Sequence, residues 1–277
     1  MMIVLLVDFA NLTLRHQRSA SPYALVRRAL LRTREAAVRV GATHIVFAFD
    51  DERLSPAFRG LPAEGRQARA RQLLEGLGYP CVALAGVSAD DLLLTLRDQA
   101  LAQGAKRVVI LSNDHDLWVA ITPLCEVCTF HATHGLRLWG AAWFQRKFGI
   151  TPAQISDLVA LGTRFTGDHR GGAVVDGRTA RSLLARYATV DHLYAQLDTV
   201  EPPALRARLA GLEAVARARQ QHFRARYAQP CTLNLEPPPS APPSVDAGLD
   251  GLDAARVLRG VAGQILDPLL ASGRNQE

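Results

Sequence analysis

The chain has 277 residues, 48% of them hydrophobic, so it is long enough to bury a substantial core. Its apolar runs fall short of the ~18 residues that a membrane span needs, and its apolar start lacks a basic leader and a small-residue cleavage site. We therefore expect a cytoplasmic protein with no membrane association. The net charge of +6 suits a phosphate-rich partner, although an arginine-rich composition also arises from a GC-rich genome.

Strand-like and helix-like segments alternate along the first half of the chain. In order, we expect a strand at 3–7, a helix at 23–40, a strand at 44–49 and a helix at 66–77. A strand at 81–84, a helix at 89–103, a strand at 108–111 and a helix at 115–121 follow. This order predicts an α/β domain with a mostly parallel sheet and helices on both faces.

The second half reads differently. Residues 124–130 and 136–138 predict a hairpin that turns near His134 and Gly135, and helices are expected at 152–161, 179–187 and 206–226. The aromatic residues around the hairpin are expected to pack the sheet against its helices. They are Trp118, Trp139, Trp143, Phe144 and Phe148. We expect an α/β domain over 1–150, a helical region over 151–232, and a Pro-rich linker with a short helix over 233–277.

Aspartates follow the expected strands. Asp8 ends the first strand, Asp50 the second, Asp90 and Asp91 come after the third, and Asp114 and Asp116 follow the fourth. The carboxyl ends of parallel strands share one edge, where ligands bind in open α/β sheets. Asp90, Asp91 and Asp114 stand where helix caps are expected, and each of these three, taken alone, is more readily explained as a cap. Together, crowded carboxylates require a cation, and oxygen ligands favour Mg²⁺ or Mn²⁺ in a site suited to phosphodiester hydrolysis.

The motifs VDFANL, VFAFDDE, GVSADDLLLTL, SNDHDL and FGITPAQISDLVAL occur in this order. The series resembles the bacterial 5′-3′ exonuclease and flap endonuclease family, over about residues 1–230. Its members include the 5′-nuclease domain of DNA polymerase I and the small stand-alone exonuclease IX type. The resemblance implies a PIN-like domain followed by a helix-hairpin-helix region, and metal-dependent hydrolysis of DNA at 5′ ends or flaps.

The resemblance also implies roles for individual residues. Metal-binding carboxylates are matched by Asp8, Asp50, Asp90, Asp91, Asp114 and Asp116. Arg15 matches an arginine near the scissile phosphate, so the residues expected to act in catalysis are Asp8, Asp50 and Arg15.

This sequence departs from the family pattern at several positions. Ser88 stands where the family has glutamate, and the later run TRFTGDHRGGAVVDGRTA lacks two aspartates, leaving Asp168 one position late. In the family, a helical arch that threads the 5′ end carries a tyrosine–lysine pair. The corresponding segment here, 53–71, lacks that pair, so Arg59 or Arg66 is the candidate replacement for it. The hairpin of the helix-hairpin-helix region is also altered here. By the resemblance, Gly171, Gly177 and Arg178 contact DNA in this region, and whether a potassium ion binds there is left open.

Three points have alternative interpretations. The missing carboxylates weaken metal affinity, so a degenerate nuclease that binds branched or duplex DNA without cleavage is a second hypothesis. The arginines of the segment 206–226 either follow phosphates or form an ordinary solvated helix face. The C-terminal helix expected at 252–270 either docks on the nuclease or binds a protein partner.

Two cysteines and two histidines near the expected hairpin form a further motif. Cys125, Cys128, His131 and His134 form C-x2-C-x2-H-x2-H, which suggests zinc. The spacing is too tight for a zinc finger, and residues three apart on a strand point to opposite faces.

Overall fold

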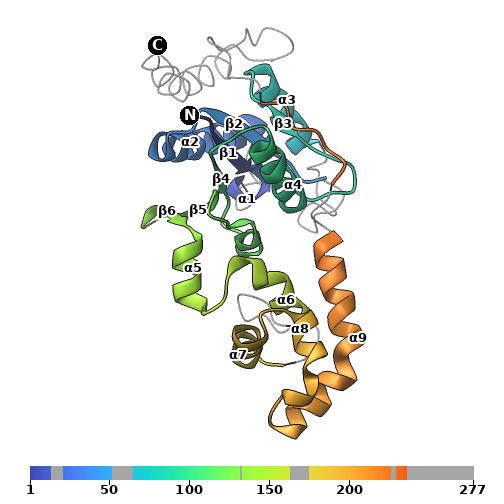
Figure 1. Ribbon diagram of the computed structural model, residues 1–277. Coiled ribbons are helices and arrows are strands. Elements are labelled where there is room, and N and C mark those ends of the chain that lie inside the picture. The colour runs from blue at the N-terminus through green and yellow to red at the C-terminus, as the bar shows by residue number, and fades with distance from the viewer. Residues whose placement is uncertain (14–20, 52–64, 132, 163–174, 226–228, 236–277) are drawn as a thin grey trace. The chain divides into compact units, whose positions relative to one another are not determined.

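The computed structural model describes residues 1–13, 21–51, 65–131, 133–162, 175–225 and 229–235. The chain divides into two compact units (Figure 1). We call the first the sheet unit; it contains Met1–Asn113, Leu124–Leu138 and, after a long excursion, 229–235. The second, the helical unit, contains Asp114–Pro123 and Trp139–Ala228. The chain passes between the units more than once along the sequence, and the domain boundary expected at residue 150 stays a prediction.

A six-stranded sheet forms the centre of the sheet unit, in the order β3-β2-β1-β4-β5-β6. The strands are β1 (Ile3–Asp8), β2 (His44–Ala48), β3 (Cys81–Val82), β4 (Arg107–Leu111), β5 (Cys125–His131) and β6 (Gly135–Trp139). The four pairings from β3 to β5 are all parallel. The prediction of a mostly parallel sheet is therefore confirmed, and the two strands of the predicted hairpin are neighbours.

Helices cover both faces of the sheet, as predicted. They are α1 (Phe9–Thr13), α2 (Pro22–Val40), α3 (Arg66–Gly76) and α4 (Ala89–Ala102). The core on one face joins Leu5 and Val7 of β1 to Leu25 of α2 and Leu74 of α3. Because strand side chains alternate, Val4 and Leu6 point to the opposite face, where α4 packs against β1, β2 and β4 (Figure 1). Every residue of β1 is buried, which is typical of a central parallel strand.

The helical unit is built from short elements and one long helix. They are η2 (His115–Ala120), α5 (Ala141–Phe148), η3 (Pro152–Gln154), α6 (Ile155–Ala160), α7 (Gly177–Tyr187), α8 (Val190–Ala195), η4 (Leu197–Thr199) and α9 (Pro203–Ala225). Buried Asp157 of α6 accepts hydrogen bonds from Val190 N–H of α8 and from Gln220 of α9. Within the described ranges, no helix is long and apolar enough to cross a membrane.

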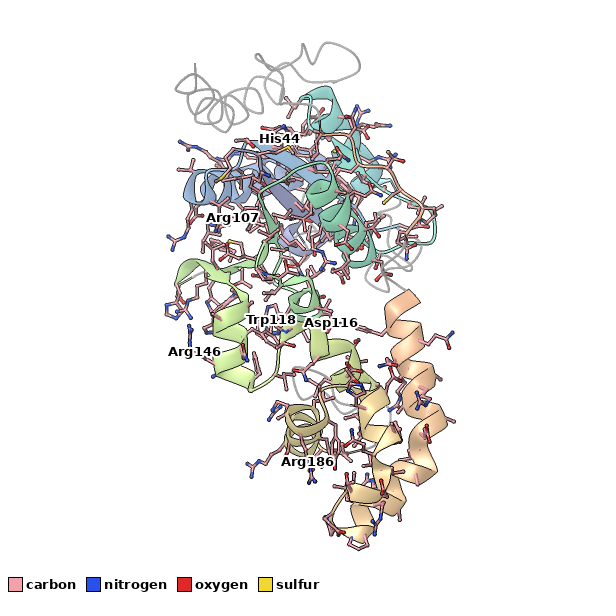
Figure 2. The ribbon with its side chains drawn as sticks, in the orientation of Figure 1. His44, Arg107, Asp116, Trp118, Arg146 and Arg186 are labelled. Atoms are coloured by element: carbon pink, nitrogen blue, oxygen red, sulfur yellow. The ribbon has the colours of Figure 1, made fainter. Side chains whose placement is uncertain are left out.

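The predicted aromatic packing is wrong in its location. The rings pack mainly on one another around Trp118, which lies within 6.4 Å, centroid to centroid, of Trp139, Trp143, Phe144 and Phe148. All five residues belong to the helical unit (Trp118 is labelled in Figure 2). Their spacing correctly indicated a core, but periodicity does not indicate which of two cores a residue joins.

Two glycines at the C-terminal ends of helices in the sheet unit should respond differently to substitution by alanine. Gly41 ends α2 at φ 69°, a left-handed conformation that a Cβ disfavours, whereas Gly76 lies within α3. A Cβ at either position would meet no atom of the described residues within 4 Å. Gly41→Ala should therefore lower the free energy of unfolding by about 1 kcal/mol, and Gly76→Ala should not lower it. Urea unfolding followed by circular dichroism measures both, and equal effects would contradict the assignment.

Candidate functional site

Asp8 is fixed at the carboxyl end of β1. It is 2% exposed; its Oδ1 accepts the Asn11 N–H at 2.9 Å and its Oδ2 accepts the Ser112 hydroxyl at 2.7 Å. Ser112 directly follows β4, which pairs with β1. A hydrogen bond between two strand ends therefore holds the Asp8 carboxylate in one orientation.

Asp50 and Asp51 follow β2 and are tied to the segment that leads into α4. Asp50 Oδ1 accepts the Ala89 N–H at 2.8 Å, and Asp51 Oδ2 accepts the Gly86 N–H at 2.6 Å. Ala89 is the first residue of α4, so Asp50 accepts from one of the amides at the positive end of a 14-residue helix. This contact fixes the orientation of the Asp50 carboxylate.

Asp90 and Asp91 lie in the first turn of α4 and are half-buried. They do not occupy the capping position that was considered for them. Ser88 is the N-cap, and its hydroxyl accepts the Asp91 N–H at 3.4 Å. The residue that stands in place of the family glutamate is thus the one that begins the helix.

Asp114 and Asp116 lie in the helical unit. Asp114 is the N-cap of η2, and its Oδ1 accepts the Asp116 N–H at 2.8 Å. The capping interpretation is therefore confirmed for Asp114. Asp116 is exposed and is labelled in Figure 2.

Three polar residues that the sequence reasoning missed hold the loops beside Asp8. Ser112 donates to Asp8, Asn11 Oδ1 accepts the Asn113 N–H at 2.9 Å, and Asn113 Oδ1 accepts the Phe130 N–H at 2.7 Å. These bonds connect α1, the end of β4 and β5. These residues belong to the motifs DFAN and LSND. Their hydrogen-bond partners are distant in sequence and become neighbours only through the order of strands in the sheet.

The donor chemistry of this edge suits a hard divalent cation. In the part of the chain that the structure describes, no three histidine, cysteine, aspartate or glutamate side chains converge as direct ligands of one ion. Mg²⁺ commonly binds through one or two carboxylates and keeps several water molecules. Asp8 and Asp50, each oriented by hydrogen bonds at the ends of adjacent strands, fit that mode of binding.

The cysteine–histidine motif has a different environment. Cys125 and Cys128 are fully buried on β5, and burial raises the pKa of both thiols to about 12. Zinc binds the thiolate, which burial disfavours here. His131 and His134 lie with their ring centroids 5.3 Å apart and are exposed.

The predicted DNA contacts are described only in part. Arg15, Arg59 and Gly171 lie outside the described residues, as does Asp168. Arg66 begins α3, and Gly177 begins α7. Asp176 caps α7 by accepting the N–H groups of Arg178 and Thr179, and the Thr179 hydrogen bonds lower the pKa of its carboxyl group.

Arg178 lines a pocket on the helical unit, together with Arg186 and Tyr187 of α7 and Glu201 (Arg186 is labelled in Figure 2). Elsewhere in this unit, two arginines of α9 have protein partners. Arg217 pairs with Glu213 and Asp191, and Arg206 donates to the Asp198 carbonyl oxygen.

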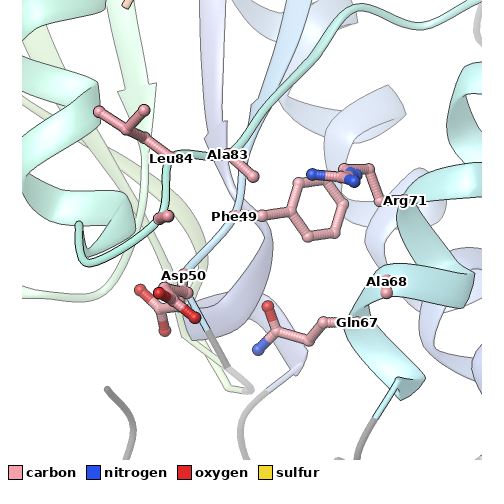
Figure 3. Close-up of a pocket in the computed structure, with 9 residues that line it drawn as sticks. Phe49, Asp50, Gln67, Ala68, Arg71, Ala83 and Leu84 are labelled. Atoms are coloured by element: carbon pink, nitrogen blue, oxygen red, sulfur yellow. The ribbon is translucent and has the colours of Figure 1, made fainter. Parts of the chain in front are cut away.

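A pocket of about 360 Å³ adjoins Asp50 in the sheet unit (Figure 3). Its apolar lining includes Phe49, Ala83 and Leu84, and its polar lining includes Asp50, Gln67 and Arg71. The Phe49 ring stacks on Phe9 with centroids 4.5 Å apart. We call this the Gln67 pocket.

Solved structures share this fold. The chain aligns with T5 5′-exonuclease bound to zinc ions over 96% of this chain and 99% of that one, with a TM-score of 0.64 and 16% identity. It aligns with the catalytic core of Rad2 in complex with DNA substrate over 96% and 92%, with a TM-score of 0.56 and 16% identity. The fold is therefore that of the PIN-like flap nucleases.

Sequence relatives identify the family. A flap endonuclease Xni from Edwardsiella ictaluri is 30% identical over 219 residues, which cover 74% of this chain and 85% of the relative. A flap endonuclease Xni from Klebsiella pneumoniae is 29% identical over 77% of this chain and 88% of the relative. The thermostable DNA polymerase I of Thermus thermophilus is 31% identical over 154 residues, only 18% of its length. No family model matches. The chain belongs to the flap endonuclease Xni family.

Proposed function

We propose that the protein is a divalent-metal-dependent 5′ nuclease that hydrolyses phosphodiester bonds in DNA. The observation that carries the proposal is the oriented pair Asp8 and Asp50, at the ends of adjacent parallel strands, in a chain of a flap endonuclease family. Mg²⁺ or Mn²⁺ is the expected cofactor, since the ligand atoms are carboxylate oxygens. A divalent-metal-bound T5 5′-exonuclease supports the class of cofactor.

In this proposal Asp8 and Asp50 hold the metal, and Asp90, Asp91, Asp114 and Asp116 are the further carboxylates assigned to it. A divalent cation held there would lower the pKa of the attacking water and offset charge on the leaving oxygen. Ser112 and the backbone N–H of Asn11 position Asp8, while the N-terminal amide of α4 orients Asp50. Arg15 is assigned to the scissile phosphate.

The proposed substrate is DNA with a 5′ end or flap. Arg59, Arg66, Gly171, Gly177 and Arg178 are the assigned DNA contacts, and a potassium ion at the hairpin stays an open part of the proposal. Structures of the Rad2 catalytic core contain DNA substrate. The arginines of α9 are weaker candidates, because Arg206 and Arg217 already have protein partners.

Metal dependence is the direct test. Purified protein should cleave a 5′-flap duplex and a 5′-recessed duplex with Mg²⁺ or Mn²⁺, and EDTA should stop the reaction. Restoring the cation should restore cleavage. DNA binding without cleavage under either cation would support the degenerate-nuclease alternative instead, and overturn the enzymatic proposal.

A further inference from the structure

The Gln67 pocket contains a buried amide with no hydrogen-bond partner among the described residues. Gln67, the second residue of α3, is 2% exposed. Within those residues, neither its Oε1 nor its Nε2 makes a hydrogen bond. Leaving both a donor and an acceptor unsatisfied destabilises a folded protein, so selection for stability alone would favour an apolar side chain here.

The surroundings of this amide indicate what would satisfy it. Figure 3 shows the Gln67 side chain extending from α3 toward Asp50, with the Phe49 ring beside it and Arg71 further along the same wall. The walls at Phe49, Ala83 and Leu84 are apolar. A flat ligand with a hydrogen-bond donor and acceptor side by side matches this combination, because a carboxamide pairs with both.

An unpaired nucleobase has that chemistry. Glutamine pairs with adenine through two hydrogen bonds, to N6 and N7, and base faces pack on apolar and aromatic walls. The volume of about 360 Å³ is sufficient for a base and part of its sugar. The Arg71 side chain, 39% exposed, pairs with Glu75 through Nε at 3.5 Å, and the other N–H groups of its guanidinium are donors for a neighbouring phosphate.

We propose that the Gln67 pocket binds one unpaired base of the DNA strand, with adenine preferred, next to the carboxylate edge that includes Asp50. The inference rests on the proposed function, since it assumes that DNA reaches this edge. The Gln67 amide is not exposed in the structure, so the proposal requires it to rotate when the base binds. This rotation is accessible because the terminal torsion of an amide side chain has a broad distribution.

The test is an abasic scan of single-stranded DNA binding, measured by fluorescence anisotropy in EDTA so that no cleavage occurs. One abasic nucleotide is moved stepwise along a labelled oligonucleotide. Wild-type protein should show one position at which losing the base weakens binding by about 5- to 100-fold, and at which adenine is the preferred base. In Gln67→Met that position should lose its effect.

The matched control is Gln72→Met, on the same helix at an exposed position. It should keep the wild-type scan. Gln67→Met should unfold at a temperature no lower than wild type, because it removes an unsatisfied buried amide. Ala68→Leu narrows the pocket from an exposed wall position, and should also flatten the scan if Gln67→Met does not fold.

A flat scan in wild-type protein would overturn the proposal, as would an unchanged scan in Gln67→Met or a loss of the effect in Gln72→Met. The measurement is independent of catalysis. A positive scan in a protein that never cleaves DNA would therefore retain the base pocket while the enzymatic proposal fails.

Discussion

Asp8→Asn should reduce metal-dependent cleavage of a 5′-flap duplex by at least about 100-fold. Replacing a residue that only positions a metal ligand commonly costs about 10- to 100-fold, and Asp8 is assigned as a ligand itself. Asparagine keeps the size of the side chain and an oxygen acceptor but removes the negative charge. Single-turnover cleavage with saturating enzyme, over a range of Mg²⁺ concentrations, measures the effect.

Two variants make this result specific. Asp98→Asn changes an exposed aspartate on α4, paired with Arg97, and should cleave like wild type. Ser112→Ala removes only the hydroxyl that donates to Asp8, so it should cost less than Asp8→Asn and raise the Mg²⁺ concentration needed for half-maximal rate. Full activity in Asp8→Asn would remove Asp8 from the metal site.

Asp157→Ala should destabilise the helical unit by about 3 kcal/mol. Asp157 is 3% exposed and joins three helices through its bonds to Val190 N–H and Gln220. Hydrogen bonds to charged groups contribute about 1.5–3 kcal/mol each, and truncation leaves buried donors without their acceptor. The three tryptophans all lie in the helical unit, so their fluorescence during urea unfolding monitors this unit.

The comparison for Asp157 is Asp191→Ala. Asp191 pairs with Arg217 at 2.7 Å, but both side chains are about half exposed, so the loss should stay below about 1 kcal/mol. Equal midpoints for the two variants would show that Asp157 does not hold the helices together.

The local sequence pattern was sufficient to predict the strands of the sheet unit. The apolar runs gave the sheet strands at nearly the observed residues, and the aspartates Asp8 and Asp50 lie at strand ends as expected. Those positions follow from short-range spacing and from the rule that parallel strands end at one edge. The assignment of these residues to metal binding and catalysis stays a prediction.

Contacts between residues far apart in the sequence could not be predicted from the sequence pattern. The bond from Ser112 to Asp8 depends on β4 lying beside β1, an order that spacing does not reveal. The short helices α1, α5 and α8 were not predicted, because stretches of five to eight residues carry little periodicity. The segment 115–121 was expected as a helix and is the 3₁₀ helix η2, which begins at the Asp114 cap.

The route of the chain limits how this protein can be divided. The backbone passes from one unit to the other after residues 113, 123, 138 and 228. Cutting the chain at any one of these crossings therefore does not release either unit, because the other crossings still join them. A chain shortened to residues 1–150 would contain most of the sheet unit but lose the returning segment 229–235. The side chains of Gln99 on α4 and of Gln103, the C-cap of α4, bind the backbone of that segment at Cys231 and Leu233. Dissection of activity into isolated fragments is therefore expected to fail here, and point substitutions are the appropriate tool.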